Sequence, residues 1–378
     1  MTLCFLPIGA YSATLPRWLE TDIGVGPATI GALIATMSIA AVAARPLGGR
    51  LSDVSGRRAA AAAGGLLCAV GAGLLLVPAA PAVVWPARAA VGIGEALVTT
   101  ACMAWVVDMV PVQRRGRALS WFGISFWLGI SLGPQVGAVA RELGGFDLVW
   151  AAAVGCSLAA VLLFRATPDS PVRAVRGEIP FAIPRAVLVP GIALGLCVFG
   201  EGVFVTFGVP HLVDAGVHEG ASFGSAASVY SVLGFAALLV RPLMAPLPDR
   251  FGGRNCALVG CALLVAGLGA IALASGFAVA AAGAAAMGVA MATLNPALAM
   301  LVAAAVEPER RGVAMGGFMS FLDIGLAAGA IAAGFVVAAS STTAAFGMAA
   351  LSAALSAALL AARAPTHAQE RAAAAALV

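Results

Sequence analysis

The sequence predicts an all-α membrane protein with twelve transmembrane helices in two six-helix halves related by an internal repeat. Composition is the first reason: of 378 residues, 62% are hydrophobic and 10% are charged, whereas a soluble domain carries about 25% charged residues. The second reason is that apolar runs of about 20 residues, the length that spans a bilayer, alternate with short arginine-bearing segments. The third is that motifs recur 196 positions apart, as from Arg45 to Arg241.

The apolar runs place the spanning helices in order along the chain. We expect helices near residues 1–19, 26–47, 59–78, 83–107, 118–139, 146–165, 186–208, 222–245, 256–275, 278–305, 313–338 and 343–362. Residues 1–165 form the N-terminal half, 166–185 a cytoplasmic linker, 186–362 the C-terminal half and 363–378 a cytoplasmic tail. Because the first helix begins at Met1 without a polar start, we expect further residues upstream. We also expect this helix, rather than a cleavable signal peptide, to initiate insertion.

Arginine placement sets the expected orientation. All 21 basic residues are arginine, and 18 of them fall after even-numbered helices or in the tail, against Arg17 and Arg141 on the opposite side, with Arg88 inside the membrane. Because cytoplasmic loops carry the excess of positive charge, both termini are predicted to be cytoplasmic. Exclusive use of arginine with abundant Ala and Gly indicates a GC-rich bacterial genome, so the expected location is the bacterial inner membrane.

A charged stretch between the second and third apolar runs organises the chain. It reads Gly49-Arg50-Leu51-Ser52-Asp53-Val54-Ser55-Gly56-Arg57-Arg58. We expect a short loop in which Asp53 begins a tight turn and Gly56 takes a positive φ, while Arg57 and Arg58 mark the cytoplasmic rim. Arg, Pro, Leu, Leu, Asp, Gly and Arg recur in register between Arg241 and Arg254. The chain is therefore predicted to contain two copies of one helical bundle.

This stretch resembles the signature G-x-L-x-D-r-x-G-r-[KR] between helices 2 and 3 of the major facilitator superfamily. The resemblance covers essentially the whole chain and implies alternating access between parallel halves, with a substrate site near the membrane midplane. It also implies that the loops are a conformational switch that holds a cytoplasmic gate closed. The matching residues are Gly49, Asp53, Gly56, Arg57 and Arg58, and in the second copy Asp249 and Arg254. Pro246, Pro248 and Gly253 degrade the second copy, so the first copy has more weight.

Four ionisable residues inside apolar runs have no counterpart at the repeat-related position: Arg88, Glu95, Glu201 and Asp323. Each costs roughly 2–4 kcal/mol at membrane depth, so an interaction or a function must offset that cost. Residues required for packing should recur in both halves, whereas residues required for chemistry need not. These four are therefore the candidate residues for binding protons or substrate.

Arg88 and Glu95 share one face of the fourth helix, two turns apart. The segment from Arg88 to Ala96 resembles the helix 4 motif R-x-x-x-G-x-G of the superfamily, which implies a part in proton coupling, with Arg88 adjusting the carboxylate. Gly92 and Gly94 are expected to thin the helix so that a neighbour or the substrate approaches its backbone. The alternative is a structural ion pair inside the bundle.

Glu201 lies on the seventh helix within Phe199-Gly200-Glu201-Gly202. We expect the flanking glycines to leave room around the carboxylate for water or a ligand. The resemblance implies that helices 1, 4, 7 and 10 line the cavity, so that Glu201 faces Glu95. A carboxylate removed from water is suited to carry a proton at cellular pH or to bind a cationic substrate. The alternative is a structural carboxylate with satisfied hydrogen bonds.

Two further residues are candidates on the tenth and eleventh helices. Asp323 lies near the middle of the eleventh helix and is expected to serve as a gate or coupling site, or as a hydrogen-bonded tie between helices. Asn295-Pro296 is expected to interrupt the tenth helix and free backbone groups, which suits the wall of a cavity.

Glycines line one face of the fifth helix. Gly129, Gly133 and Gly137 recur at a spacing of four and permit close contact between helices, and Pro134 is expected to kink the helix. The run resembles the antiporter-associated motif G-x-x-x-G-P-x-x-G-G, with Ala138 in place of its last glycine. Ordinary packing through GxxxG is the alternative.

Other chemistry is not indicated. The seven cysteines lie inside apolar runs without a CxxC or Cys/His cluster, so we interpret them as small core residues. His211 and His218 are interpreted as part of a solvated external loop rather than a metal site. We predict no catalytic residue, no metal, no cofactor and no nucleic-acid partner. The proton gradient is expected to drive the protein.

The predicted function is secondary active transport, and specifically proton-coupled efflux of a small lipophilic or cationic compound, such as a drug or secondary metabolite, by a monomer embedded in the bilayer. An uptake symporter for a sugar or organic acid on the same fold is the first alternative. Sugar carriers usually offer more polar side chains, and Arg88 as the one buried cation disfavours anions. A membrane-embedded enzyme or sensor is a further alternative that no motif supports.

Overall fold

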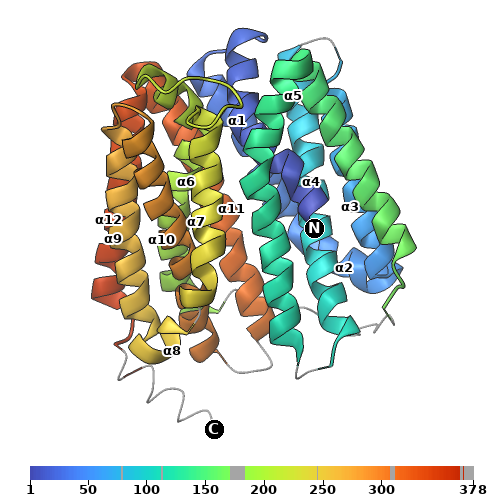
Figure 1. Cartoon of the computed structure of the whole chain (residues 1–378). Coiled ribbons are helices and arrows are strands. Elements are labelled where there is room, and N and C mark those ends of the chain that lie inside the picture. Colours follow the sequence, from blue (N-terminus) through green and yellow to red (C-terminus); the bar gives the residue numbers. More distant parts are fainter. Residues whose placement is uncertain are drawn as a thin grey trace. The chain divides into compact units, whose positions relative to one another are not determined.

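The computed structural model describes residues 1–77, 80–111, 114–170, 184–244, 246–306, 311–366 and 369, and no strand occurs among them. Its helices are drawn in Figure 1. They are α1 (Thr2–Thr21), α2 (Pro27–Ser55), α3 (Arg57–Leu74), α4 (Pro81–Met109), α5 (Arg115–Ala166), the 3₁₀ turn η2 (Arg185–Val187), α6 (Leu188–Asp214), α7 (Ala226–Met244), α8 (Leu247–Phe251), α9 (Gly253–Ala272), α10 (Phe277–Ala304), α11 (Arg311–Ala339) and α12 (Thr342–Arg363).

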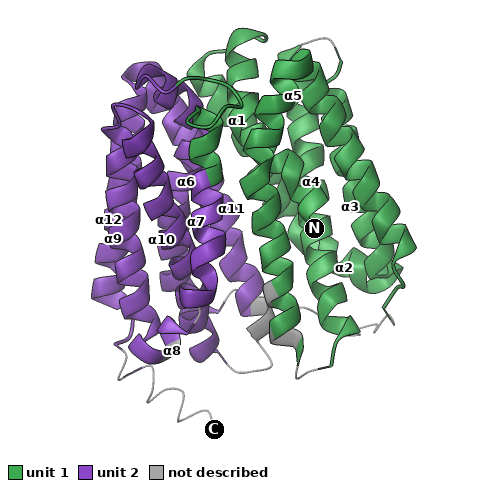
Figure 2. Ribbon diagram, in the orientation of Figure 1, with its two compact units in different colours: residues 1–176, 218–231 green, residues 177–217, 232–378 purple. Residues whose placement is uncertain are grey.

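The chain divides into two compact units, coloured separately in Figure 2. Unit 1 consists of Met1–Arg176 and His218–Ser231, and unit 2 of Gly177–Val217 and Val232–Val378. Helices α1–α5 therefore lie in unit 1, whereas α6, most of α7 and α8–α12 lie in unit 2. One short segment, residues 218–231, belongs to unit 1 although the chain on both sides of it belongs to unit 2.

Helix α5 supplies two of the predicted spans. Its backbone departs from helical geometry at Gly144 (φ −157°, ψ 25°) and Gly145 (φ 68°, ψ −165°), where the chain turns between two helical arms. The positive φ of Gly145 is one that residues with a side chain rarely adopt. The two arms correspond to the helices predicted at 118–139 and 146–165.

Nine helical stretches in the described part of the chain are long and apolar enough to cross a membrane. The kinked α5 counts once among them. Helices α1 and α3 fall outside the nine because Pro16 and Arg17 in α1, and Arg57 and Arg58 in α3, lower their mean hydropathy. The nine stretches, the second arm of α5, α1 and α3 together match the twelve predicted helices.

The charged stretch after the second apolar run is helical, and the loop predicted there is wrong. Helix α2 continues through Pro46 to Ser55, so that Arg45 lies inside the helix and Asp53 in its last turn. At a membrane boundary an unbroken helix keeps backbone groups paired, which an extended loop cannot do. Gly56 alone separates α2 from α3 and has φ 94° and ψ 152°, which confirms the predicted positive φ.

The repeat is visible in backbone geometry and in packing. Gly252, the counterpart of Gly56, has φ 87° and ψ 149° between α8 and α9. A Cβ atom at Gly92 would overlap the backbone of Met37 in α2, and one at Gly288 would overlap the backbone of Leu233 in α7. Gly56 and Gly252 are 196 residues apart, and so are Gly92 and Gly288. Small residues thus allow the same close helix contact in both units.

The glycine face of α5 packs against α1. A Cβ atom at Gly133 would lie 2.6 Å from Gly9 Cα, one at Gly129 would lie 2.7 Å from the carbonyl oxygen of Thr2, and one at Gly137 would lie 2.9 Å from Ala10 Cβ. Pro134 lies inside the helix, which does not end there. The face therefore brings two backbones into direct contact.

We expect Gly133→Ala to lower the free energy of unfolding by about 1–3 kcal/mol, because the added methyl group meets backbone atoms that cannot move aside. Thermal unfolding of the purified protein in detergent measures the loss. Gly155→Ala is the matched control on the same helix, since no atom lies within 4 Å of a Cβ at that position. Equal stability of the two variants would show that the contact with α1 is not tight.

Candidate functional site

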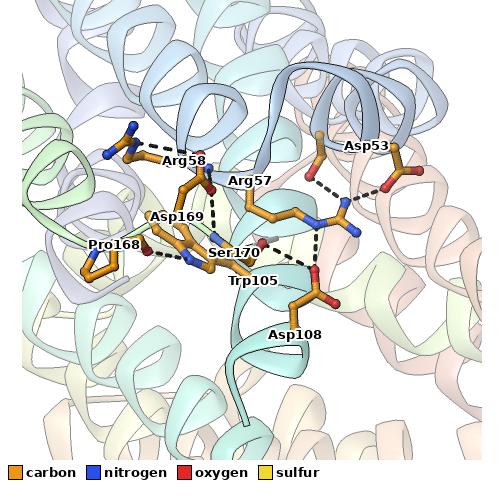
Figure 3. A network of polar contacts seen from close by, with 9 residues as sticks. Asp53, Arg57, Arg58, Trp105, Asp108, Pro168, Asp169 and Ser170 are labelled. Atoms are coloured by element: carbon orange, nitrogen blue, oxygen red, sulfur yellow. Dashed lines mark hydrogen bonds and ion pairs between the residues drawn. The ribbon is translucent and has the colours of Figure 1, made fainter. Parts of the chain in front are cut away.

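Arg57, the first residue of α3, joins α2 to α4. Its Nη1 donates hydrogen bonds to the Asp53 carboxylate and, at 2.9 Å, to Ser52 Oγ, and its Nε donates to Asp108 Oδ2 at 3.0 Å (Figure 3). Burial lowers the pKa of the Arg57 guanidinium, but the hydrogen bonds to Asp108 and Asp53 outweigh burial and the net shift is upward. The side chain therefore remains a cation and forms an ionic bridge across three helices.

The chain that follows α5 is attached to the same place (Figure 3). The backbone N–H of Arg58 donates to Asp169 Oδ1 at 3.1 Å, and Arg58 Nε lies 3.7 Å from Asp169 Oδ2. Trp105 Nε1 in α4 donates to the carbonyl oxygen of Pro168 at 3.2 Å. An anion at the N-terminus of α3 is favoured by the helix dipole. The start of the segment predicted as a linker is thus bound to the ionic bridge.

The second copy of the motif has a different arrangement. Arg254 Nε and Nη2 donate to the carbonyl oxygens of Leu360 and Ala361, at 3.2 and 2.7 Å. These carbonyls belong to the last turn of α12, where a cation is favoured. Gly253 stands at the position that Arg57 occupies in the first copy, and the side chain of Asp249 lies outside the described residues. Arg254 therefore caps the C-terminal end of α12.

Arg88 is buried in α4 and contacts α1 and α2. Only 5% of the residue is exposed. Its Nη2 donates to the carbonyl oxygen of Ile34 at 3.3 Å, and its guanidinium carbon lies 5.9 Å from the centre of the Tyr11 ring. Its Nε has no hydrogen-bond partner among the described residues. The structural ion pair between Arg88 and Glu95, which was the alternative interpretation of the sequence, is not formed.

Glu95 pairs with an arginine of α2 instead. Its Oε2 lies 3.9 Å from Arg45 Nη2, and Thr99 Oγ1 donates to its Oε1 at 2.8 Å. The side chain of Glu95 is 10% exposed and that of Arg45 is 21% exposed. Because the residues predicted as a loop are part of helix α2, Arg45 lies beside the membrane-spanning part of α4. The sequence interpretation that Arg88 is the one buried cation overlooked this residue.

Glu201 lies inside α6 and is half-buried. Among the residues that the structure describes, none forms a hydrogen bond or ion pair with its carboxylate. The prediction that Gly200 and Gly202 leave room beside it is wrong: a Cβ at Gly200 would meet Leu268 of α9, and one at Gly202 would meet the backbone of Leu326 and Ala330 in α11. The glycines are packing residues that hold α6 against two neighbours.

The remaining candidates occupy helices of unit 2 or the end of α2. Asp323 in α11 is 4% exposed, and it has an interaction partner within the protein. Asn295 is half-buried in α10, which runs without interruption past Pro296, so the predicted break there is wrong. Its side-chain amide has no hydrogen-bond partner within the described ranges. Gly49 lies in α2 with no described atom within 4 Å of a Cβ position.

Sequence reasoning also misplaced a histidine. His211 lies inside α6 and is 4% exposed, not in a solvated loop. Its Nε2 lies 2.8 Å from the carbonyl oxygen of Ile271, and its Nδ1 lies 2.9 Å from Thr342 Oγ1. A neutral ring satisfies both partners, donating to one oxygen and accepting from the other. His211 therefore ties α6 to α9 and α12. No group of three or more metal-binding side chains occurs in the part of the chain that the structure covers.

Comparison with known proteins identifies one family that matches nearly the whole chain. The family profile described as Major Facilitator Superfamily matches residues 1–280 and 192–377. An uncharacterised MFS-type transporter of Burkholderia mallei is 32% identical over 371 residues, which cover 93% of this chain and 87% of that protein. The uncharacterised MFS-type transporter YhhS of Shigella flexneri is 28% identical over 343 residues, which cover 88% of this chain and 83% of that protein.

Solved structures share the fold at low sequence identity. A mutant of the peptide transporter POT has a TM-score of 0.81 with 16% identity, covering 96% of this chain and 92% of that one. The nucleoside transporter NupG has a TM-score of 0.75 with 18% identity, covering 96% of this chain and 95% of that one.

We expect Arg57→Lys to lower the free energy of unfolding by about 1–2 kcal/mol, because an ammonium group cannot hold both carboxylates with the geometry of a guanidinium. Thermal unfolding in detergent again measures the change. Arg50→Lys is the control, since Arg50 is an exposed arginine near the start of the same stretch. The bridge would be unimportant for stability if the two variants unfolded at the same temperature.

Proposed function

Because the chain belongs to the Major Facilitator Superfamily, we propose that this multi-pass membrane transporter is a proton-coupled exporter of small lipophilic or cationic compounds, such as drugs or secondary metabolites. The observation that supports the proposal is the carboxylate of Glu201, half-buried inside α6 without a partner among the described residues. The family accounts for transport, and Glu201 accounts for the coupling to protons.

A carboxylate at this depth is costly while it is charged and unpaired. A proton removes the charge, and a cationic substrate neutralises it. Since one carboxylate does not hold both at full strength, binding of a proton promotes release of the cation, and binding of the cation promotes release of the proton. This competition is the basis of exchange between a proton that enters and a substrate that leaves.

Glu95 is the second proton-binding residue in this proposal. Its ion pair with Arg45 and its hydrogen bond from Thr99 hold α4 against α2. Protonation of Glu95 would weaken that contact. The same two helices are joined at their ends by Arg57 through Asp53 and Asp108. Glu95 would therefore couple proton binding to the ionic bridge, while Arg88 and Asp323 support the surrounding helices.

The setting of the proposed exporter follows from the helix surfaces and the arginine distribution. Large apolar side chains that remain more than half exposed on spanning helices, such as Leu162, Leu239 and Phe335, suit contact with lipid. The excess of arginine after even-numbered helices supports cytoplasmic termini in a bacterial inner membrane. The proton gradient drives the cycle of a monomer, without another cofactor.

Uptake of a polar substrate, such as a sugar or an organic acid, is the second candidate function. Asn295 supports it, because this half-buried amide in α10 has no hydrogen-bond partner among the described residues. An amide of this kind both donates and accepts hydrogen bonds, as a hydroxylated substrate requires.

Inside-out vesicles loaded with an acid-sensing dye test the two candidates. After energisation, addition of lipophilic cations and antibiotics is expected to restore dye fluorescence as protons leave. Glu201→Gln is expected to reduce this recovery to that of vesicles without the protein, because an amide cannot carry the proton, and Glu95→Gln is expected to slow it. Asp147→Asn is the control, since Asp147 is exposed at the start of the second arm of α5.

Full recovery with both glutamine variants would contradict the assignment of the proton-binding residues. Absence of recovery with any compound, together with proton entry driven by a sugar or acid gradient in right-side-out vesicles, would establish the uptake function instead.

A further inference from the structure

A short segment of the chain is bound to unit 1 while both of its ends continue into unit 2. This segment, residues 218–231, contains the connection after α6 and the first residues of α7, and is called the strap here. Figure 2 shows it in the colour of unit 1. The residues directly before and after the strap, Val217 and Val232, belong to unit 2. Any displacement of unit 2 relative to unit 1 at this place must therefore bend the strap or detach it.

An acidic residue of the strap is bound by two arginines of unit 1. Arg141 Nη1 donates to Glu219 Oε1 at 2.9 Å, and Arg17 Nε lies 3.4 Å from the same oxygen. The guanidinium carbon of Arg141 lies 4.9 Å from the centre of the Phe146 ring, which holds the cation in place. Arg17 and Arg141 are the two arginines that the sequence places on the side opposite the arginine-rich loops.

The backbone of the strap is bound as well. The amide N–H of Ala221 donates to Glu142 Oε1 at 2.7 Å. Gly220 has φ +134°, and a Cβ atom there would lie 2.7 Å from that same carboxylate oxygen. A residue with a side chain at position 220 would be strained and would also collide with Glu142. The glycine is therefore required for the docked arrangement.

A third contact involves the first turns of α7. Gln135 Nε2 in α5 donates to Ser228 Oγ at 2.8 Å. Within the described residues, the buried Gln135 Oε1 and Ser231 Oγ atoms have no hydrogen-bond partner. Undocking would give both oxygens access to water or other partners, which offsets part of the loss of the other contacts. The docked strap is thus held by part-exposed ion pairs, and its hydrogen bonding is incomplete.

We propose that the strap is a releasable latch on the side opposite the arginine-rich loops, and that its separation from Arg17, Arg141, Glu142 and Gln135 is a step of the transport cycle. Glu219 is the positioning residue that binds the latch. The inference requires alternating movement of the two units, and does not depend on the direction of transport or the identity of the substrate.

Spin labels on the two units test the latch without any substrate. Ala82→Cys at the exposed start of α4 in unit 1 and Leu273→Cys at the exposed end of α9 in unit 2 carry the labels. The part-exposed native cysteine is removed by Cys156→Ser, and the other six native cysteines are buried. Double electron–electron resonance in lipid nanodiscs then measures the distribution of distances between the labels.

Glu219→Gln is expected to shift the distribution towards longer distances, because the amide loses both ion pairs. The charge exchange of Arg141→Glu with Glu219→Arg is expected to shift it back towards the parent protein. Glu20→Gln is the matched control: it removes the other carboxylate bound by Arg17, at 2.9 Å, which does not belong to the strap. This variant is expected to leave the distances unchanged.

Hydrogen–deuterium exchange provides the second measurement. The amides of residues 218–231 are expected to exchange faster in Glu219→Gln and in Gly220→Val, while those of α3 and α4 keep the parent rate, which shows that unit 1 remains folded. Unchanged distances together with unchanged exchange of the strap in both variants would overturn the proposal. Failure of the dye assay alone would contradict the proposed substrate and proton coupling, but it would not contradict the latch.

Discussion

An ionisable side chain inside a membrane span has to be paired, hydrogen-bonded or open to water, because hydrocarbon cannot solvate a charge. The chain meets this constraint differently at each position. Glu95 is held by Arg45 and Thr99, and Arg88 by the backbone of α2 and the ring of Tyr11. Glu201 has no such partner among the described residues. The helices thus provide fixed partners for some charges, and in the proposed function the carboxylate of Glu201 is neutralised by a proton or a cationic substrate.

The internal repeat separates the scaffold from the chemistry. The turn at Gly56 and its counterpart at Gly252 have nearly the same backbone angles, because both must reverse the chain within one residue at the membrane boundary. The ionic bridge is not duplicated: Arg57 has Gly253 as its counterpart, and Asp108 has Ala304. Close helix packing is required twice, whereas Arg57 and Asp108, which form this bridge in unit 1, are replaced by Gly253 and Ala304 at the equivalent positions of unit 2.

Sequence reasoning reached the features that are local or periodic. The twelve helices follow from apolar runs, the repeat from aligned motifs, and the turn at Gly56 from its neighbours. Contacts between distant segments escaped it: Asp108 lies 51 residues from Arg57, and Asp169 lies 111 residues from Arg58. The charge of Arg45 was misinterpreted as the start of a loop, whereas α2 continues past Arg45 to Ser55.

The strength of these contacts suits a protein that changes state. An exposed ion pair contributes about 0.2–1 kcal/mol, whereas breaking a buried one costs about 3–5 kcal/mol. The side chains of Glu219, Arg17 and Arg141 are 25%, 29% and 31% exposed, and that of Asp108 is 28% exposed. Several part-exposed pairs together bias an equilibrium by a few kcal/mol, which differential binding of a ligand to two states can reverse. Fully buried pairs would hold one state more strongly, so the partial exposure of these ionic contacts suits the proposed alternating access.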